Sequence, residues 1–138
     1  MPNTFQLEIV TPSRLLVKEA AEEAQIPGAS GYLGILPGHA PLITELAVGV
    51  ITYRARGATH TLSVAWGFME VLPDKVTILA EAAERPQEID SARAQKSKER
   101  AEERLKSTDP QIDYTRAEDA RQRAETRLNV AQDVTKEK

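Results

Sequence analysis

IPGASGYLGILPGHAPL, residues 26–42, contains four glycines and three prolines among its apolar residues. Glycine adopts positive φ angles without steric cost, while proline fixes φ and removes a backbone donor. This spacing predicts short strands joined by tight turns, at the edge of a compact β domain.

Short apolar runs separated by turn residues continue on both sides of this segment. In the first run, Phe5, Leu7 and Ile9 alternate with polar residues, as in a strand with one buried face. The expected strands lie at residues 5–11, 14–17, 22–26, 31–36, 42–45, 48–54, 60–65, 68–72 and 75–80. Many short strands favour an antiparallel sandwich or barrel. We expect Trp66 and Phe68 to anchor its core, and the Pro73-Asp74 pair to form a hairpin turn.

The chain changes composition near residue 85. All seven glycines lie at or before Gly67, whereas residues 85–138 hold 13 basic and 12 acidic side chains. A glycine-free segment rich in Ala, Glu, Arg and Lys is typical of solvated helices. The sequence therefore predicts a β-sandwich domain at 1–84 and a helical hairpin domain at 85–138, with Pro86 interrupting any continuous element.

Composition also narrows the function classes. A net charge of −3 gives no basic footprint for a nucleic acid. The chain has no cysteine, and His39 and His60 are its only histidines, so no metal-ligand motif is implied. We find no convergent nucleophile, base or phosphate loop, and therefore expect no catalysis by the chain alone. No apolar run reaches membrane-spanning length.

The second part of the chain contains an internal repeat. The segment from Ile89 to Ala94, IDSARA, recurs as IDYTRA from Ile112 to Ala117, an offset of 23 residues. Each copy is expected to open a helix, with Asp90 and Asp113 as N-cap residues. Because the intervening Ser-Thr-Asp-Pro segment at 107–110 cannot continue a helix, the two helices should form an antiparallel hairpin.

Small side chains dominate the predicted contact between these helices. The residues at helical spacing are Ala94, Ser97, Ala101, Leu105, Ala117, Ala120, Ala124, Leu128 and Ala131. A buried alanine methyl contributes roughly 0.8 kcal/mol, against about 1.5–3 kcal/mol for a leucine side chain. The hairpin is therefore a candidate for opening or undocking, although a merely flexible tail would have the same composition.

Antiparallel pairing predicts a cluster of arginines at the open end of the hairpin. If the turn centres near Asp109, Arg93 lies close to Arg123 and Arg127, whose like charges need an anion between them. That anion could be Glu84 or Asp90, or a bound phosphate. Alternatively, these arginines form a solvated face paired with local acids such as Glu125. In the middle of the hairpin, Arg100 is expected to face Asp119.

Several motifs resemble those of the epsilon subunit of bacterial F-type ATP synthases. They are GYLGILPGHAPLITEL at 31–46, VAWGFMEV at 64–71, DKVTILA at 74–80 and the C-terminal helix pair. The resemblance implies a ten-stranded, flattened antiparallel β-sandwich followed by a C-terminal two-helix antiparallel hairpin. It also implies a noncatalytic central-stalk subunit whose partners are the gamma subunit, the c-ring and the alpha and beta subunits.

The same resemblance implies a nucleotide site in the hairpin. Some bacterial members bind ATP through the motif I/L-D-x-x-R-A, which residues 89–94 match without departure. The residues implied in ATP binding are Glu84, Ile89, Asp90, Arg93, Ala94, Arg123 and Arg127. Tyr32 and His39 fall at positions implied in partner contact, with no catalytic residue and no metal.

Regulation and location are further expectations from the resemblance. The sandwich would couple gamma rotation to the c-ring, and the hairpin would restrain ATP hydrolysis by extending toward the alpha and beta subunits. Bound ATP, as a regulatory ligand, would favour the folded hairpin. The chain would lie peripherally at the cytoplasmic side of a bacterial membrane. The alternative is a β-sandwich protein-binding module with a helical adaptor and no nucleotide binding.

Overall fold

A computed structural model describes residues 3–132 of the chain. The chain divides into two compact units between Glu84 and Arg85. The first unit contains the strands β1 Phe5–Thr11, β2 Arg14–Ala21, β3 Glu23–Gly28, β4 Gly31–Ile35, β5 Leu42–Leu46, β6 Gly49–Ala55, β7 Ala58–Val71 and β8 Lys75–Glu84. The second contains the 3₁₀ turn η1 Pro86–Glu88 and the helices α1 Ser91–Lys106 and α2 Tyr114–Ala131.

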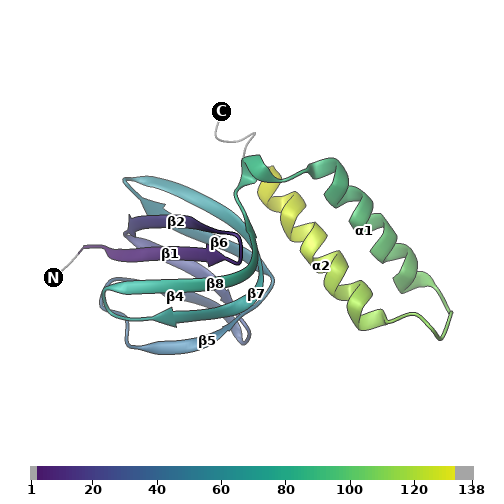
Figure 1. The fold of residues 1–138 in the computed structure, drawn as a ribbon, viewed down its shortest axis with the longest axis horizontal. Helices are drawn as coiled ribbons and strands as arrows, with labels where there is room; N and C mark the ends of the chain where they lie inside the picture. The colour runs from purple at the N-terminus through teal and green to yellow at the C-terminus, as the bar shows by residue number, and fades with distance from the viewer. Residues whose placement is uncertain (1–2, 133–138) are drawn as a thin grey trace. The chain divides into compact units, whose positions relative to one another are not determined.

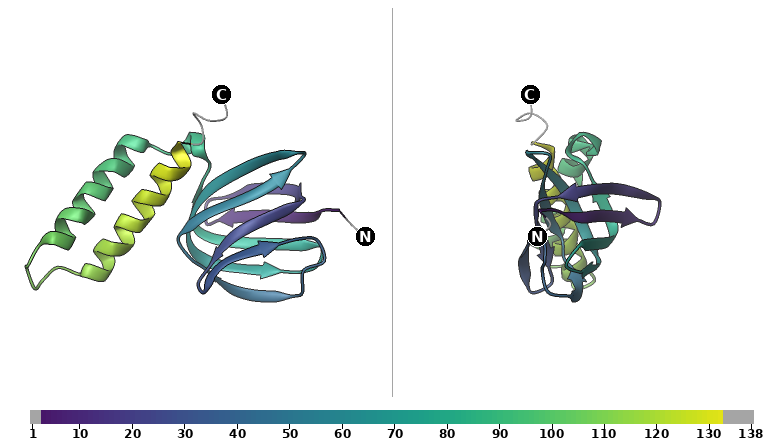
Figure 2. Two further views of the ribbon diagram at one scale, coloured as in Figure 1. Left: turned by 180° about the vertical axis from the view of Figure 1, so that it is seen from behind. Right: turned by 90° about the vertical axis from the view of Figure 1, so that its left-hand side faces the viewer.

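The first unit is a β-sandwich, as the sequence predicts, in which the sheet folds over on itself (Figure 1). Strand β7 pairs with β6 through its first half and with β5 through its second half. Strand β3 pairs with both β5 and β6, which closes the sheet. Figure 2 shows the same strands from behind and from the side.

One pairing departs from the expected antiparallel arrangement. Strands β1 and β8 run parallel, with Leu7 opposite Val76 and Ile9 opposite Ile78. These strands are the first and last of the sandwich, so no short hairpin constrains their direction. The other strand pairs are antiparallel, including β7 and β8, which the predicted turn at Pro73 and Asp74 connects.

The strand count also differs from the ten that the family resemblance implied. The described residues form eight strands. Of the nine runs expected from the sequence, the two at 60–65 and 68–72 belong to the single strand β7. That strand bends where Trp66 and Gly67 take φ angles of 52° and 132°. Its pairing changes from β6 to β5 across the bend, so one continuous strand serves both parts of the sandwich.

The same bend overturns the prediction that Trp66 and Phe68 anchor the core. Before the bend, Leu62 and Val64 point inward, whereas after it Met69 and Val71 do so. The inward positions thus change from even to odd numbers, which leaves Trp66 only half-buried and Phe68 exposed. Strict alternation cannot anticipate this change, because it assumes an unbroken pleat.

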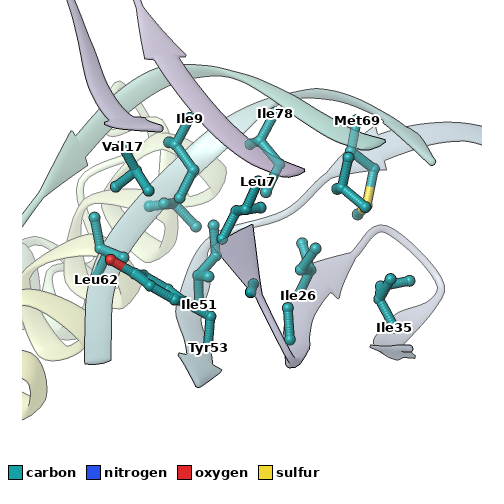
Figure 3. Packing of buried hydrophobic residues seen from close by; sticks show 14 of the residues in the cluster. Leu7, Ile9, Val17, Ile26, Ile35, Ile51, Tyr53, Leu62, Met69 and Ile78 are labelled. Atoms are coloured by element: carbon teal, nitrogen blue, oxygen red, sulfur yellow. The ribbon is translucent and has the colours of Figure 1, made fainter. Parts of the chain in front are cut away.

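The core of the sandwich is instead mainly aliphatic, and Figure 3 shows Tyr53 among its aliphatic side chains. Phe5 is its other large aromatic member. The Tyr53 hydroxyl donates a 2.7 Å hydrogen bond to the Glu19 carboxylate, and its ring stacks on His60 with centroids 5.0 Å apart. Further buried residues are Leu7, Ile9, Val17, Ile26, Ile35, Ile51, Leu62, Met69 and Ile78. Interior packing of this kind gives the first unit a conventional hydrophobic core.

Candidate functional site

The two helices of the second unit begin in the same way, as the repeat predicts. The Asp90 carboxylate accepts a 3.1 Å hydrogen bond from the Arg93 amide, and the Asp113 carboxylate accepts one of 3.0 Å from the Arg116 amide. Each aspartate thus satisfies one of the amides that a helix start leaves without a partner. Both N-cap predictions are confirmed.

The contact between the helices depends on four alanines. The buried alanines are Ala94 and Ala101 in α1 and Ala117 and Ala124 in α2. Ala94 corresponds to Ala117, and Ala101 to Ala124, under the 23-residue offset of the repeat. The remaining expected contact residues are half-buried: Ser97, Leu105, Ala120, Leu128 and Ala131. Thr126 and Val130, near the end of α2, are also buried. The contact residues predicted from helical spacing did not include them.

The antiparallel hairpin places Arg93 and Arg127 in its half away from the turn, while Arg123 lies closer to the middle. Arg93 lies in the first turn of α1 and Arg127 in the second turn from the end of α2, whereas Arg123 lies one turn further back, at the middle of α2. In Figure 1 the start of α1 and the end of α2 lie at the same end of the hairpin. Arg93 and Arg123 are exposed and Arg127 is half-buried. Arg123 and Arg127 each interact with another group of the chain.

The other residues of the expected nucleotide motif surround the start of α1. Ile89 is half-buried and directly precedes the Asp90 cap, whereas Ala94 is fully buried in the first turn. Glu84 is the last residue of β8 and pairs in register with Ser63 of β7, so it belongs to the first unit. The hairpin alone therefore contains six of the seven expected residues.

The ion pair that joins the two helices at the middle of the hairpin differs from the expected one. Across the helices, Lys98 lies 3.7 Å from the Glu125 carboxylate. Arg100 is exposed and donates to the Ser97 hydroxyl at 3.3 Å, and within residues 3–132 it makes no ion pair with Asp119. The expected Arg100–Asp119 pair is thus wrong, because the Lys98–Glu125 contact sets a register in which Arg100 lies level with Arg123 and not with Asp119.

Sequence reasoning also missed the ion-pair network of Arg121 on α2. Its guanidinium contacts the carboxylates of Glu118, one turn before it, and Glu125, at 2.7 Å one turn after it. The hydrogen bond from Arg121 lowers the pKa of Glu118, and in return the pKa of Arg121 is raised. The spacing indicates this network, because acidic residues three positions before and four positions after an arginine lie beside it on a helix.

Tyr32 and His39, the expected partner-contact residues, lie in and just after β4. The Tyr32 hydroxyl accepts a 3.0 Å hydrogen bond from the Val50 amide, although much of the side chain is exposed. The Nδ1 atom of His39 lies 2.7 Å from the Ala40 carbonyl oxygen, to which it donates. Both residues therefore have a structural role that does not bury them.

An exposed apolar row on the sandwich was not expected from the sequence. Leu79 of β8 is the direct neighbour of Phe68 in β7 and of Val10 in β1, and Val10 is the neighbour of Leu15 in β2. Leu79, Phe68 and Leu15 are 56%, 56% and 53% exposed. We call Leu15, Val10, Leu79 and Phe68 the outer apolar row. Knowledge of strand register is needed to find it.

Neither a metal site nor a membrane-spanning helix is found among the residues that the structure describes. Between residues 3 and 132, no three or more His, Cys, Asp or Glu side chains gather as a metal site. Neither α1 nor α2 has the length and apolar character that crossing a bilayer requires.

Comparison with known proteins matches both units. Residues 4–86 match the family model described as ATP synthase, Delta/Epsilon chain, beta-sandwich domain. Residues 87–132 match the model described as ATP synthase, Delta/Epsilon chain, long alpha-helix domain.

Similar proteins include the epsilon chains of bacterial ATP synthases. An ATP synthase epsilon chain of Koribacter versatilis is 68% identical over 111 residues, which cover 80% of this chain and 78% of the relative. An ATP synthase epsilon chain of Solibacter usitatus is 51% identical over 102 residues, which cover 74% of this chain and 76% of that relative.

Among solved structures, a chain of the Euglena gracilis mitochondrial ATP synthase, in a structure of OSCP, F1 and c-ring, aligns with a TM-score of 0.81 and 25% identity. The alignment covers 95% of this chain and 82% of that one. The family resemblance drawn from the sequence motifs is confirmed, and this chain belongs to the ATP synthase delta/epsilon chain family.

Proposed function

We propose that this chain is a rotor subunit in the central stalk of a bacterial ATP synthase, where its sandwich joins the gamma subunit to the c-ring. As a member of the epsilon family, it is a noncatalytic subunit of that complex. Its location is then peripheral, at the cytoplasmic side of the membrane, through the complex. The mobile hairpin regulates the machine by contact with the alpha and beta subunits.

The outer apolar row supports a protein partner for the sandwich. Three large apolar side chains in adjacent strands lie more than half exposed on one surface. Contiguous apolar surface of this kind marks interaction sites on soluble proteins. We assign the row to the gamma subunit, because a stalk contact that transmits torque needs a broad, well-packed surface. Tyr32 and His39 are assigned to the c-ring.

The hairpin site supports ATP as a regulatory ligand. The single observation that carries this assignment is that α1 supplies Arg93 and α2 supplies Arg127 and Arg123 to one half of a hairpin whose helices meet through alanines. A triphosphate would bind cations from both helices at once, and this is possible only while the helices are folded together. Such a ligand shifts the equilibrium toward the folded hairpin, because its affinity differs between the two states.

The remaining motif residues have distinct roles in this proposal. Asp90 fixes the first turn of α1 and so places Arg93. Ala94 allows close approach of α2, and Ile89 offers an apolar contact to the nucleotide. Glu84, the last residue of the sandwich, stays a member of the site only as the family resemblance implies. In the extended state, without ATP, the hairpin would restrain wasteful hydrolysis by the complex.

Calorimetric titration of ATP into the full chain tests the site. Replacing Arg93 or Arg127 by Ala should weaken binding at least about tenfold, since each change removes a charge-assisted hydrogen bond. Arg54→Ala, which removes an exposed guanidinium from β6, is the control and should bind ATP as the unaltered chain does. Equal affinity in all of these proteins would reject the site.

The same titration separates the alternative function. A sandwich module with a helical adaptor, unrelated to ATP synthesis, predicts neither a heat of ATP binding nor co-purification with the gamma and beta subunits. For the outer apolar row, Phe68→Ser should weaken co-purification with the gamma subunit, while Ile43→Ser, also exposed but outside the row, should not.

A further inference from the structure

The two helices of the hairpin are related by the repeat in structure as well as in sequence. The cap residues have nearly the same backbone angles, φ −83° and ψ 96° at Asp90 and φ −81° and ψ 97° at Asp113. The buried alanines also correspond under the 23-residue offset. Two equivalent antiparallel helices are exchanged by an approximate twofold axis between them, so a feature at one end has a counterpart at the other.

The counterpart of the proposed ATP cluster follows from this exchange. Arg93 of α1 maps onto Arg116 of α2. Conversely, Arg123 and Arg127 of α2 map onto Arg100 and Arg104 of α1. Arg116 starts its helix and Arg104 ends its own, so both lie at the turn end of the hairpin.

A surface depression lies at this place. Its volume is about 370 Å³, and it is lined by Arg104, Gln111, Ile112, Asp113, Arg116 and Ala117. The lining therefore contains four residues of the second motif copy, together with an arginine from the other helix. Small-molecule sites begin at about this size. We call this depression the tip pocket.

The charges in the tip pocket favour an anion. Within residues 3–132, neither the Arg104 nor the Arg116 guanidinium has a hydrogen-bond or ion-pair partner. The nearby carboxylates are engaged with the backbone, since Asp113 accepts from the Arg116 amide and Asp109 accepts from the Gln111 amide at 2.9 Å. Arginine forks bind phosphate oxygens in a bidentate manner.

We propose that the tip pocket is a second anion site, in which Arg104 and Arg116 bind the phosphate groups of a nucleotide or of an inorganic polyphosphate. The half-buried Ile112 supplies an apolar wall beside them, and the Gln111 side-chain amide can donate to a phosphate oxygen. A ligand here contacts α1 and α2 together, so it would hold the turn end closed. The first motif copy serves only as a template, and the proposal does not require ATP to bind there.

Nuclear magnetic resonance of the full chain tests this site, with ATP and inorganic tripolyphosphate as separate probes. We expect the amide resonances of residues 111–117 to shift with at least one probe. Shifts with both indicate that phosphate groups suffice, whereas shifts with ATP alone assign a nucleotide. The combined variant Arg104→Gln and Arg116→Gln should weaken this binding at least about tenfold.

Two further variants keep the outcome specific. Lys106→Gln removes an exposed cation of the same helix that does not line the tip pocket, and it should leave the shifts unchanged within about twofold. The pair Arg93→Ala and Arg127→Ala removes the proposed ATP site, and the shifts at residues 111–117 should persist. Loss of those shifts in this pair, or their survival in the Arg104 and Arg116 variant, would overturn the second site.

The two proposals can fail separately. Shifts confined to residues 89–94 and 123–127 would overturn the tip pocket and leave the ATP site standing. Shifts confined to residues 111–117 would support the tip pocket and contradict the ATP site. Circular dichroism of each variant identifies any loss of helix, and Arg104→Gln alone, which removes no cap, remains informative if Arg116→Gln disturbs the fold.

Discussion

Gly67 is the residue on which the shape of the sandwich depends most directly. Its φ angle of 132° disfavours any residue with a side chain, and a Cβ atom there would clash with the backbone carbonyl oxygen of Leu79 in β8. The bend at Gly67 also reverses which side chains of β7 face the core. One glycine thus determines the paths of two adjacent strands.

We expect Gly67→Ala to lower the free energy of unfolding by about 2 kcal/mol or more, because backbone strain and steric overlap act together. Gly34→Ala is the matched control: Gly34 lies in β4, has no positive φ, and has open space at its Cβ position. Urea unfolding followed by Trp66 fluorescence measures both. Equal stability of the two variants would contradict this assignment.

At the scale of single elements, the start of α2 depends on its aspartate cap. Asp113→Ala removes the acceptor of the Arg116 amide and should cost about 1 kcal/mol of helix stability. Asp119→Ala, within the same helix, removes an equal charge and no cap. Thermal melts of the full chain followed by circular dichroism should show a lower hairpin transition for the first variant alone.

The ion pairs of Arg121 make α2 sensitive to acid. Arg121 lowers the pKa of Glu118, so the folded helix holds this carboxylate in its charged form more firmly than the unfolded chain does. The resulting stabilisation is complete above the unfolded pKa of about 4.3 and is lost as the pH falls through the lower folded value. Because Glu118 is exposed, the effect should be small and screened by salt.

Acid titration of hairpin helicity measures this effect. Helicity should decrease as the pH is lowered below about 4, and Glu118→Gln should remove part of that decrease. If Glu118→Gln has the same acid profile as the unaltered chain, the ion pair contributes nothing to the helix.

At the scale of the whole molecule, the two units should differ in stability. The sandwich has an extensive core of large aliphatic side chains, whereas the contact between α1 and α2 is formed mainly by alanine methyls. Hydrogen exchange of the full chain should therefore be slow in β7 and β8 and faster by orders of magnitude across residues 94–124. Exchange at similar rates in both units would show that the hairpin is as firmly held as the sandwich.

Much of this architecture is predictable from local sequence, and the exceptions share a cause. Both aspartate caps and the buried alanines follow from short-range patterns within one helix. By contrast, the exposure of Phe68 depends on a bend two residues earlier. The outer apolar row and the parallel pairing of β1 with β8 depend on strands far apart in the chain.

The candidate site follows the same division. The repeat and the direction of the helices predict that Arg93 lies near Arg127 and Arg123, and the bounds of α1 and α2 place Arg93 and Arg127 in the same half of the hairpin. The side-chain partners do not follow so readily, as the Lys98–Glu125 pair in place of Arg100–Asp119 demonstrates. Long side chains choose among several neighbours within reach, and helix orientation about its axis decides between them.

The alanine contact has a consequence for the life of the molecule in the cell. Separating two helices that meet through leucines would expose a large apolar surface, which promotes aggregation. Parting α1 from α2 uncovers mostly methyl groups among charged side chains. Opening of the hairpin, as we propose it, would therefore carry only a small change in heat capacity and expose little surface that promotes aggregation.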